Sequence, residues 1–153
     1  MNLDIHRPVI PRPMRIYIMG PLTAKKADGT DDAWEISKNV ARAVEVGKGL
    51  FLKGHWVYCP HAQTQGWFRE EAPAFGSYER VVTHHDILGW IRLCDALFRL
   101  PGWQKSRGSI MEGVAAGHMG LLTYDDLEDV PTVEGWEGLY EDWKAGKENA
   151  DGH

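Results

Sequence analysis

The chain of 153 residues has only two cysteines, Cys59 and Cys94, and no long apolar run. Two cysteines cannot build a disulfide framework, so we expect reduced, buried thiols and a cytoplasmic protein. No segment approaches the ~20 apolar residues that span a bilayer, and residues 1–13, with three prolines, do not have the pattern of a secretory signal. The sequence therefore predicts no membrane partner.

Motifs of several common enzyme classes are also missing. There is no GxGxxG, P-loop or GxSxG sequence, so dinucleotide-binding, kinase-type and α/β-hydrolase functions lack support. HExxH and paired Cys/His spacings are missing as well, and the adjacent His84 and His85 would point to different faces of a helix. We therefore expect no metal and no cofactor. A neutral histidine near a bound ligand is the better interpretation for one of His55, His61, His84 and His85.

Charge is distributed unevenly around a net value of −5. Residues 1–124 carry 15 basic and 12 acidic side chains, whereas residues 125–153 carry 2 and 10. An acidic tail on a mildly basic body argues against binding long nucleic acid over the whole surface. A small anionic ligand held by a few local cations remains compatible with this pattern.

Apolar periodicity predicts alternating strands and helices. Four short β-rich runs occur, and the first three are followed by glycine or proline. Apolar residues in the segments between them recur at helical spacing. The expected strands are 15–19, 55–59, 95–100 and 120–124; the expected helices are 32–52, 77–93 and 108–117; the expected loops are 24–30 and 61–76. This βαβαβαβ order predicts a single α/β domain with a three-layer parallel sheet, Rossmann-like or flavodoxin-like.

The pattern divides the chain into a proline-containing extension (1–14), the α/β domain (15–124) and an acidic tail (125–153). Two helices have a predicted apolar face. In the helix 77–93 this face is formed by Val81, Ile87, Leu88 and Ile91. In the tail, a docked helix is predicted from the spacing of Trp136, Leu139, Tyr140 and Trp143.

In open parallel sheets, ligands bind beyond the carboxyl ends of the strands, and residues 101–112 follow such an end. Ser106 to Ser109 lead into a helix, where free N–H groups and the helix dipole favour an anion, and Lys105 and Arg107 add positive charge. Glu112 follows shortly after. Taken alone, it could be a carboxylate that stabilises the first helical turn or forms a capping box with Ser109.

Four segments in order, residues 16–21, 84–87, 94–97 and 106–116, resemble the nucleoside 2-deoxyribosyltransferase superfamily. The chain looks closest to a small branch with a Leu-Pro-Gly-Trp-x-x-Ser-x-Gly stretch, here residues 100–108. The resemblance covers about residues 15–124. It implies a nucleotide or nucleoside as the small-molecule partner, and a homodimer or larger homo-oligomer.

The resemblance also implies roles for individual residues. Glu112 matches the nucleophile that attacks the anomeric carbon, Asp86 the acid that protonates the leaving base, and Tyr17 the tyrosine that orients the nucleophile. Ser106 departs from the deoxyribosyltransferases, which often have an acid there, and agrees with the nucleoside-monophosphate N-glycosidases, which hold a 5′-phosphate. The candidate substrate-binding residues are Gly20, Pro21, Ser106, Gly108, Ser109, His61 and Trp67.

The chemistry of carboxyl groups indicates a mechanism for Glu112 and Asp86. N-glycosidic cleavage needs one ionised carboxylate as nucleophile and one protonated carboxyl as acid. We expect Glu112 to stay ionised near its helix N-terminus, and the pKa of Asp86 to rise in a site closed by Trp67 or Phe68. Asp95, in contrast, is interpreted as a structural residue that accepts backbone hydrogen bonds.

The leading hypothesis is an enzyme that hydrolyses a (deoxy)nucleoside 5′-monophosphate to free base and sugar 5-phosphate. One alternative is a nucleoside 2-deoxyribosyltransferase, in which a second base replaces water as the acceptor. Another is a nucleotide-binding module without turnover. The residues 24–30 and 63–74, which would set base specificity, leave these alternatives open.

Overall fold

The computed structural model describes residues 12–63 and 76–151. Four parallel strands form one sheet in the order β2-β1-β3-β4. The strands are β1 (Arg15–Met19), β2 (Trp56–Tyr58), β3 (Ala96–Arg99) and β4 (Leu122–Tyr124). The predicted α/β fold with a parallel sheet is thus confirmed, and each predicted strand is found within two residues of its expected ends.

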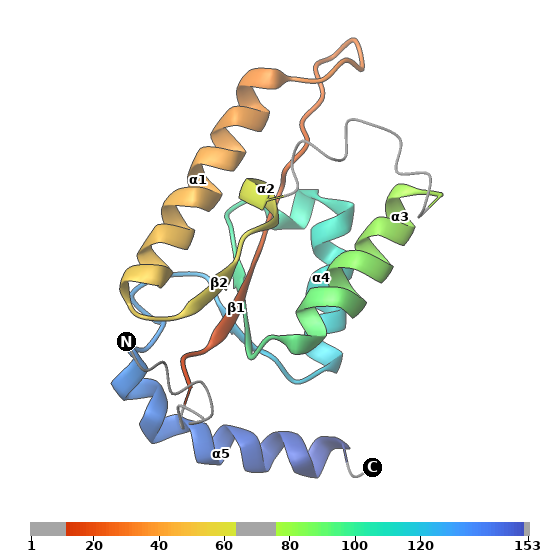
Figure 1. The fold of residues 1–153 in the computed structure, drawn as a ribbon. Helices are drawn as coiled ribbons and strands as arrows, with labels where there is room; N and C mark the ends of the chain where they lie inside the picture. Colours follow the sequence, from red (N-terminus) through yellow and green to blue (C-terminus); the bar gives the residue numbers. More distant parts are fainter. Residues whose placement is uncertain (1–11, 64–75, 152–153) are drawn as a thin grey trace, which may run out of the picture.

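Helices cover both faces of this sheet (Figure 1). They are α1 (Ala33–Leu52), α2 (Pro60–Gln63), α3 (Tyr78–Arg80), the π-helix η2 (Val81–Trp90), the short 3₁₀ helices η3 (Ile91–Leu93) and η4 (Trp103–Lys105), α4 (Arg107–His118) and α5 (Val133–Asp151). The helix α1 has the predicted start, because the side chain of Asp32 accepts a hydrogen bond from the backbone N–H of Glu35 at 3.1 Å. The residues 61–76 were expected to be a loop, but 61–63 belong to α2.

Strand alternation separates the core into two apolar layers. From β1, Ile16 and Ile18 pack with α1 and α5, whereas Tyr17 and Met19 pack with η2 and α4. Both layers are buried, so the domain has the expected helix–sheet–helix order. Cys59 and Cys94 are free, buried thiols, as predicted.

The second helical segment is not the ordinary α-helix that the sequence predicted. Residues 81–90 form a π-helix, whose i→i+5 hydrogen bonds widen each turn. Its buried positions, together with the next one in η3, are Val81, Val82, Asp86, Ile87 and Ile91. The predicted face is therefore wrong at Leu88, which is 43% exposed, because residues four or five apart share a side.

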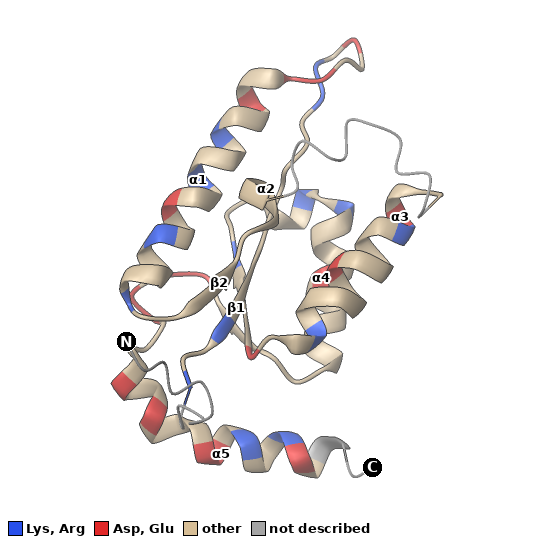
Figure 2. Ribbon diagram, viewed as in Figure 1, with Lys and Arg blue, Asp and Glu red and all other residues tan. Residues whose placement is uncertain are grey.

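The acidic tail does form a docked helix, α5, at the amino-terminal end of the strands (Figure 1). Trp136 is fully buried, and its indole N–H donates to the backbone oxygen of Arg12 at 3.0 Å. Tyr140 and Trp143 pack against the same apolar layer, but Leu139 is 51% exposed, so the predicted apolar face is wrong at Leu139. Figure 2 shows acidic positions along the ribbon of α5, together with a few basic ones.

Asp95 lies immediately before β3 and joins the N-terminal segment to the sheet. Its carboxylate accepts the backbone N–H of Arg15 at 2.8 Å and also binds the guanidinium groups of Arg12 and Arg15. Burial opposes ionisation of Asp95, but these hydrogen bonds outweigh it and lower its pKa. The structural interpretation of Asp95 is confirmed.

Candidate functional site

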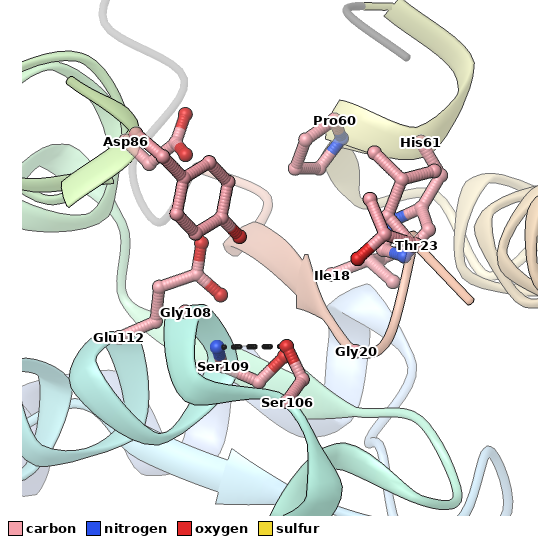
Figure 3. Close-up of a pocket in the computed structure, with 12 residues that line it drawn as sticks. Ile18, Gly20, Thr23, Pro60, His61, Asp86, Ser106, Gly108, Ser109 and Glu112 are labelled. Atoms are coloured by element: carbon pink, nitrogen blue, oxygen red, sulfur yellow. Dashed lines mark hydrogen bonds between the residues drawn. The ribbon is translucent and has the colours of Figure 1, made fainter. Parts of the chain in front are cut away.

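A pocket lies at the carboxyl ends of the strands, where the chain leaves β1 toward one side of the sheet and β3 toward the other. This is the switch point at which open α/β sheets bind ligands. The pocket encloses about 490 Å³, including its open mouth, and is lined by Ile18, Gly20, Leu22, Thr23, Pro60, His61, Tyr78, Asp86, Ser106, Gly108, Ser109 and Glu112. We call it the inner pocket. Residues 94 positions apart in the sequence, from Ile18 to Glu112, meet there (Figure 3).

Most of the predicted site residues line this pocket. Glu112 and Asp86 lie on one side in Figure 3, and Thr23 and His61 on the other. Tyr17 lies behind the wall, where its hydroxyl donates to Oε1 of Glu112 at 2.9 Å. Pro21 does not line the inner pocket but lines a neighbouring one. Trp67 lies outside the described residues, so its predicted role stays a prediction.

Glu112 is not a capping residue. The helix α4 begins at Arg107, and its N-cap is Ser106, whose hydroxyl oxygen accepts the backbone N–H of Ser109 at 3.3 Å. Glu112 therefore lies in the second turn, and its carboxyl group bonds to Tyr17 instead of to the helix end. The capping-box interpretation of Glu112 is wrong, which leaves its buried carboxyl group without a role in helix formation.

Ser106 and Gly108 place the start of α4 at the pocket. The first N–H groups of a helix have no partner within it, and the dipole makes this end attractive to an anion. Because the Ser106 oxygen accepts the capping bond, its hydroxyl hydrogen is still able to donate to a ligand. A Cβ at Gly108 would lie 2.6 Å from the Tyr78 hydroxyl oxygen, so a larger residue there would displace Tyr78 from the pocket wall.

The protonation of the two carboxyl groups differs from the sequence-based expectation. Burial, reinforced by the charge of Asp86, raises the pKa of Glu112 to about 8, so Glu112 holds a proton at neutral pH. Burial also raises the pKa of Asp86, as predicted, although the hydrogen bond from His85 at 2.7 Å opposes this. The expectation that Glu112 stays ionised is wrong, because desolvation outweighs a helix end one turn away.

The remaining buried polar groups of the wall are neutral. Burial lowers the pKa of His61, so its imidazole is uncharged, and Nε2 lies 3.2 Å from the backbone oxygen of Pro21. Since a carbonyl can only accept, Nε2 carries the hydrogen and Nδ1 is an acceptor. Within the described part of the chain, Nδ1 of His61 has no hydrogen-bond partner. The predicted neutral histidine at the site is therefore in place.

Tyr78 is a site residue that the sequence did not reveal. It follows the N-cap Ser77 of α3 and belongs to no motif, yet it lines the inner pocket and contacts the start of α4. Its pKa is raised by burial and by the charges of Glu112 and Asp86, so the phenol stays protonated. Only the fold brings it to this place.

His55, in contrast, has a structural position. Nδ1 of His55 accepts the backbone N–H of Met14 at 3.2 Å, and Nε2 lies 2.6 Å from the oxygen of Pro131. Among the described residues, no group of three His, Cys, Asp or Glu side chains is arranged to hold a metal ion. In the same part of the chain, no helix is long and apolar enough to cross a membrane.

No protein-family profile matches this sequence, and no curated protein matches it significantly. Assignment of a function therefore depends on the motifs and on the geometry of the inner pocket.

Proposed function

We propose that this protein is an N-glycosidase of the nucleoside 2-deoxyribosyltransferase superfamily that hydrolyses a (deoxy)nucleoside 5′-monophosphate to free base and sugar 5-phosphate. The observation that carries the proposal is the pair of buried carboxyl groups, Asp86 and Glu112, in one pocket with the start of α4. None of the described residues that line this pocket is a lysine or arginine. Such a site favours the positive charge that develops on a sugar during glycosidic cleavage.

In the first step, a carboxylate oxygen of Glu112 attacks the anomeric carbon, and the bond from this carbon to the base nitrogen breaks. The base leaves with the bonding electron pair and takes the proton of Asp86. The product is a glycosyl ester on Glu112. Tyr17 orients the attacking carboxylate, because its hydroxyl group donates a hydrogen bond to Oε1 of Glu112.

In the second step, water attacks the anomeric carbon and gives a proton to Asp86, and the ester bond to Glu112 breaks. This restores both carboxyl groups and releases the sugar phosphate. Ser106 and the first N–H groups of α4 bind the 5′-phosphate, because a hydroxyl and a helix N-terminus both favour an anion. An acid in place of Ser106 would repel it.

The test is to incubate the protein with a panel of ribo- and deoxyribonucleoside 5′-monophosphates, modified pyrimidines included, and to measure free base by chromatography. We expect base release from at least one of them. Release from none of them contradicts the proposal. If a free base must be added before any reaction occurs, and an exchanged nucleoside forms, the protein is a transferase; tight binding without turnover identifies a binding module.

Replacing Ser106 by alanine tests the phosphate assignment. The substitution removes one hydrogen bond to a charged group, worth roughly 1.5–3 kcal/mol, or about ten- to a hundredfold in affinity. We expect this loss for the monophosphate and little change for the unphosphorylated nucleoside, measured by calorimetry. Equal losses for both ligands contradict a phosphate at Ser106 and favour the transferase.

We further propose that the protein acts in the cytoplasm as a homodimer or larger homo-oligomer. Free, buried Cys59 and Cys94 suit a reducing compartment. Exposed apolar side chains, among them Trp56, Trp90 and Leu93, offer a surface for a second copy. Light scattering at micromolar concentration is expected to give at least twice the mass of the chain, and a strict monomer contradicts this proposal.

A further inference from the structure

A second pocket adjoins the inner pocket at the start of α4. It encloses about 990 Å³, including open solvent, against about 490 Å³ for the inner pocket. We call it the outer pocket. Both pockets are lined by Thr23, Tyr78, Ser106 and Gly108, so they share one wall and a ligand can extend from one into the other.

The two pockets differ in charge. Asp86 and Glu112 line the inner pocket, where no described residue is cationic. The outer pocket is lined by three cations, Arg42, Lys105 and Arg107, against one carboxylate, Glu35. This local excess of positive charge occurs in a chain whose net charge is −5.

These cations come from separate elements. Arg42 lies on α1, Lys105 ends η4, and Arg107 begins α4. Within the described residues, Arg42 and Lys105 form no ion pair, and Arg107 lies 3.2 Å from Glu79 with its own side chain 78% exposed. The carboxylate of Glu35 is already paired with Lys38. The outer pocket therefore keeps positive charge to offer to an anion.

We propose that the outer pocket binds a second phosphate, so that the preferred substrate class is the nucleoside 5′-diphosphates. This inference rests on the proposed function. The first phosphate occupies the shared wall at Ser106 and Gly108, and the next phosphate along the 5′ chain enters the outer pocket. Hydrolysis then yields free base and a sugar 5-diphosphate by the two steps described above, with water as the only co-reactant.

The experiment measures binding and turnover separately. Calorimetry on Glu112→Gln, which prevents consumption of the ligand, compares the mono- and diphosphates of adenosine, guanosine, cytidine, uridine and thymidine. We expect at least one diphosphate to bind about tenfold more tightly than its monophosphate. The wild-type protein is expected to release base from the same diphosphate with the higher kcat/KM.

Two further variants locate the second phosphate. In the Glu112→Gln protein, combining Arg42→Ala with Lys105→Ala is expected to abolish the tenfold preference, because it removes two cations of the outer pocket. Lys48→Ala is the matched control, since it removes an exposed cation from the same helix α1 but from neither pocket. It should leave the preference intact.

Each contrary result has a distinct meaning. Equal affinity for mono- and diphosphates overturns the inference. An equal loss of affinity for both nucleotides in the Arg42→Ala, Lys105→Ala protein also overturns it, because this result would place the first phosphate in the outer pocket. Base release from monophosphates alone leaves the proposed function standing and overturns the diphosphate preference. Release from no nucleotide contradicts the proposed function, while the calorimetry still decides whether a second phosphate is bound.

Discussion

Glu112 is protonated in the resting inner pocket, although the proposed reaction needs it as an ionised nucleophile. Burial and the charge of Asp86 raise the pKa of Glu112 to about 8, so in the resting pocket at neutral pH Glu112 holds a proton. The proposed reaction needs the same single proton on Asp86. In the proposed reaction, the reactive form is therefore the less populated one, in which the shared proton lies on Asp86 and Glu112 is ionised. Both limits of the expected pH range follow from this.

The kcat/KM for base release is expected to show a bell-shaped dependence on pH. As pH rises through about 8, the one proton is lost, no acid remains for the departing base, and kcat/KM falls. As pH falls through the raised pKa of Asp86, a second proton enters, Glu112 can no longer ionise, and kcat/KM falls again. Measuring base release across pH in the wild-type protein tests this profile.

Asp86→Asn provides the control for that profile. It removes the charge that helps to raise the pKa of Glu112, and it removes the acid. The residual activity is then expected to rise with pH and to level off, because only ionised Glu112 is required. A wild-type profile that continues to rise above pH 8 contradicts the shared-proton account.

Sequence reasoning found the individual groups of the site better than their states. Ser106, Glu112, Asp86 and Tyr17 could be selected because each belongs to a motif in a recognisable order. The protonation of Glu112 could not be predicted, because it depends on the burial of its carboxyl group, which only the assembled fold produces. Arg42 was missed for a similar reason, since it lies in the middle of α1, far in sequence from the other lining residues.

At the scale of the elements, Tyr78 of α3 lies against Gly108 of α4 in the wall of the inner pocket. Gly108→Ala places a Cβ 2.6 Å from the Tyr78 hydroxyl oxygen, so we expect a loss of about 1–3 kcal/mol of stability from overpacking. In a Tyr78→Phe background the nearest ring carbon is 3.4 Å away, and the loss should shrink. Urea unfolding of the four proteins gives the difference.

Gly117→Ala is the control for this cycle, because it lies in the same helix with nothing within 4 Å of the added Cβ. It is expected to stabilise the protein by about 0.5–1 kcal/mol, as alanine does in a helix interior. If Gly108→Ala costs the same in both backgrounds, the Tyr78 hydroxyl is not what requires glycine at this position.

The order of the elements followed from the sequence, whereas the π-helix did not. Short β-rich runs, the first three of them followed by glycine or proline, predicted all four strands. A helix with i→i+5 bonds has a different period, so Leu88 was assigned to the buried face and is exposed. In η2, sequence spacing alone therefore predicts the wrong buried face. The same helix places Asp86 in the wall of the inner pocket.

At the scale of the whole molecule, the docked tail helix α5 and the two candidate ligand pockets lie at opposite ends of the sheet. The helix α5 lies at the amino-terminal end of the strands (Figure 1). Both pockets are lined by residues that follow the carboxyl ends of the strands. The fully buried Trp136 packs edge-on against Tyr140 and Trp143, with ring centroids 5.5 and 5.4 Å away. The tail is therefore part of the core and not an appendage.

Trp136→Ala is expected to destabilise the protein by about 3–5 kcal/mol, since it leaves a large cavity under α5 and removes the bond to Arg12. Urea unfolding measures this loss. Nucleotide affinity under folding conditions should not change, because Trp136 lines neither pocket. Trp34→Ala, at a side chain that is 72% exposed, should cost less than about 0.5 kcal/mol. Equal losses for the two variants contradict a structural role for α5.

The central claim is that Glu112 forms a bond to the sugar. Its most direct test is the single-turnover rate of base release, with excess protein and the best nucleotide of the panel, in wild type, Glu112→Gln and the exposed control Glu134→Gln on α5. We predict a fall of at least about a thousandfold for Glu112→Gln, because no other group can form the ester, and a normal rate for Glu134→Gln. A Glu112→Gln protein that binds nucleotide and releases base within about tenfold of the wild-type rate contradicts the claim.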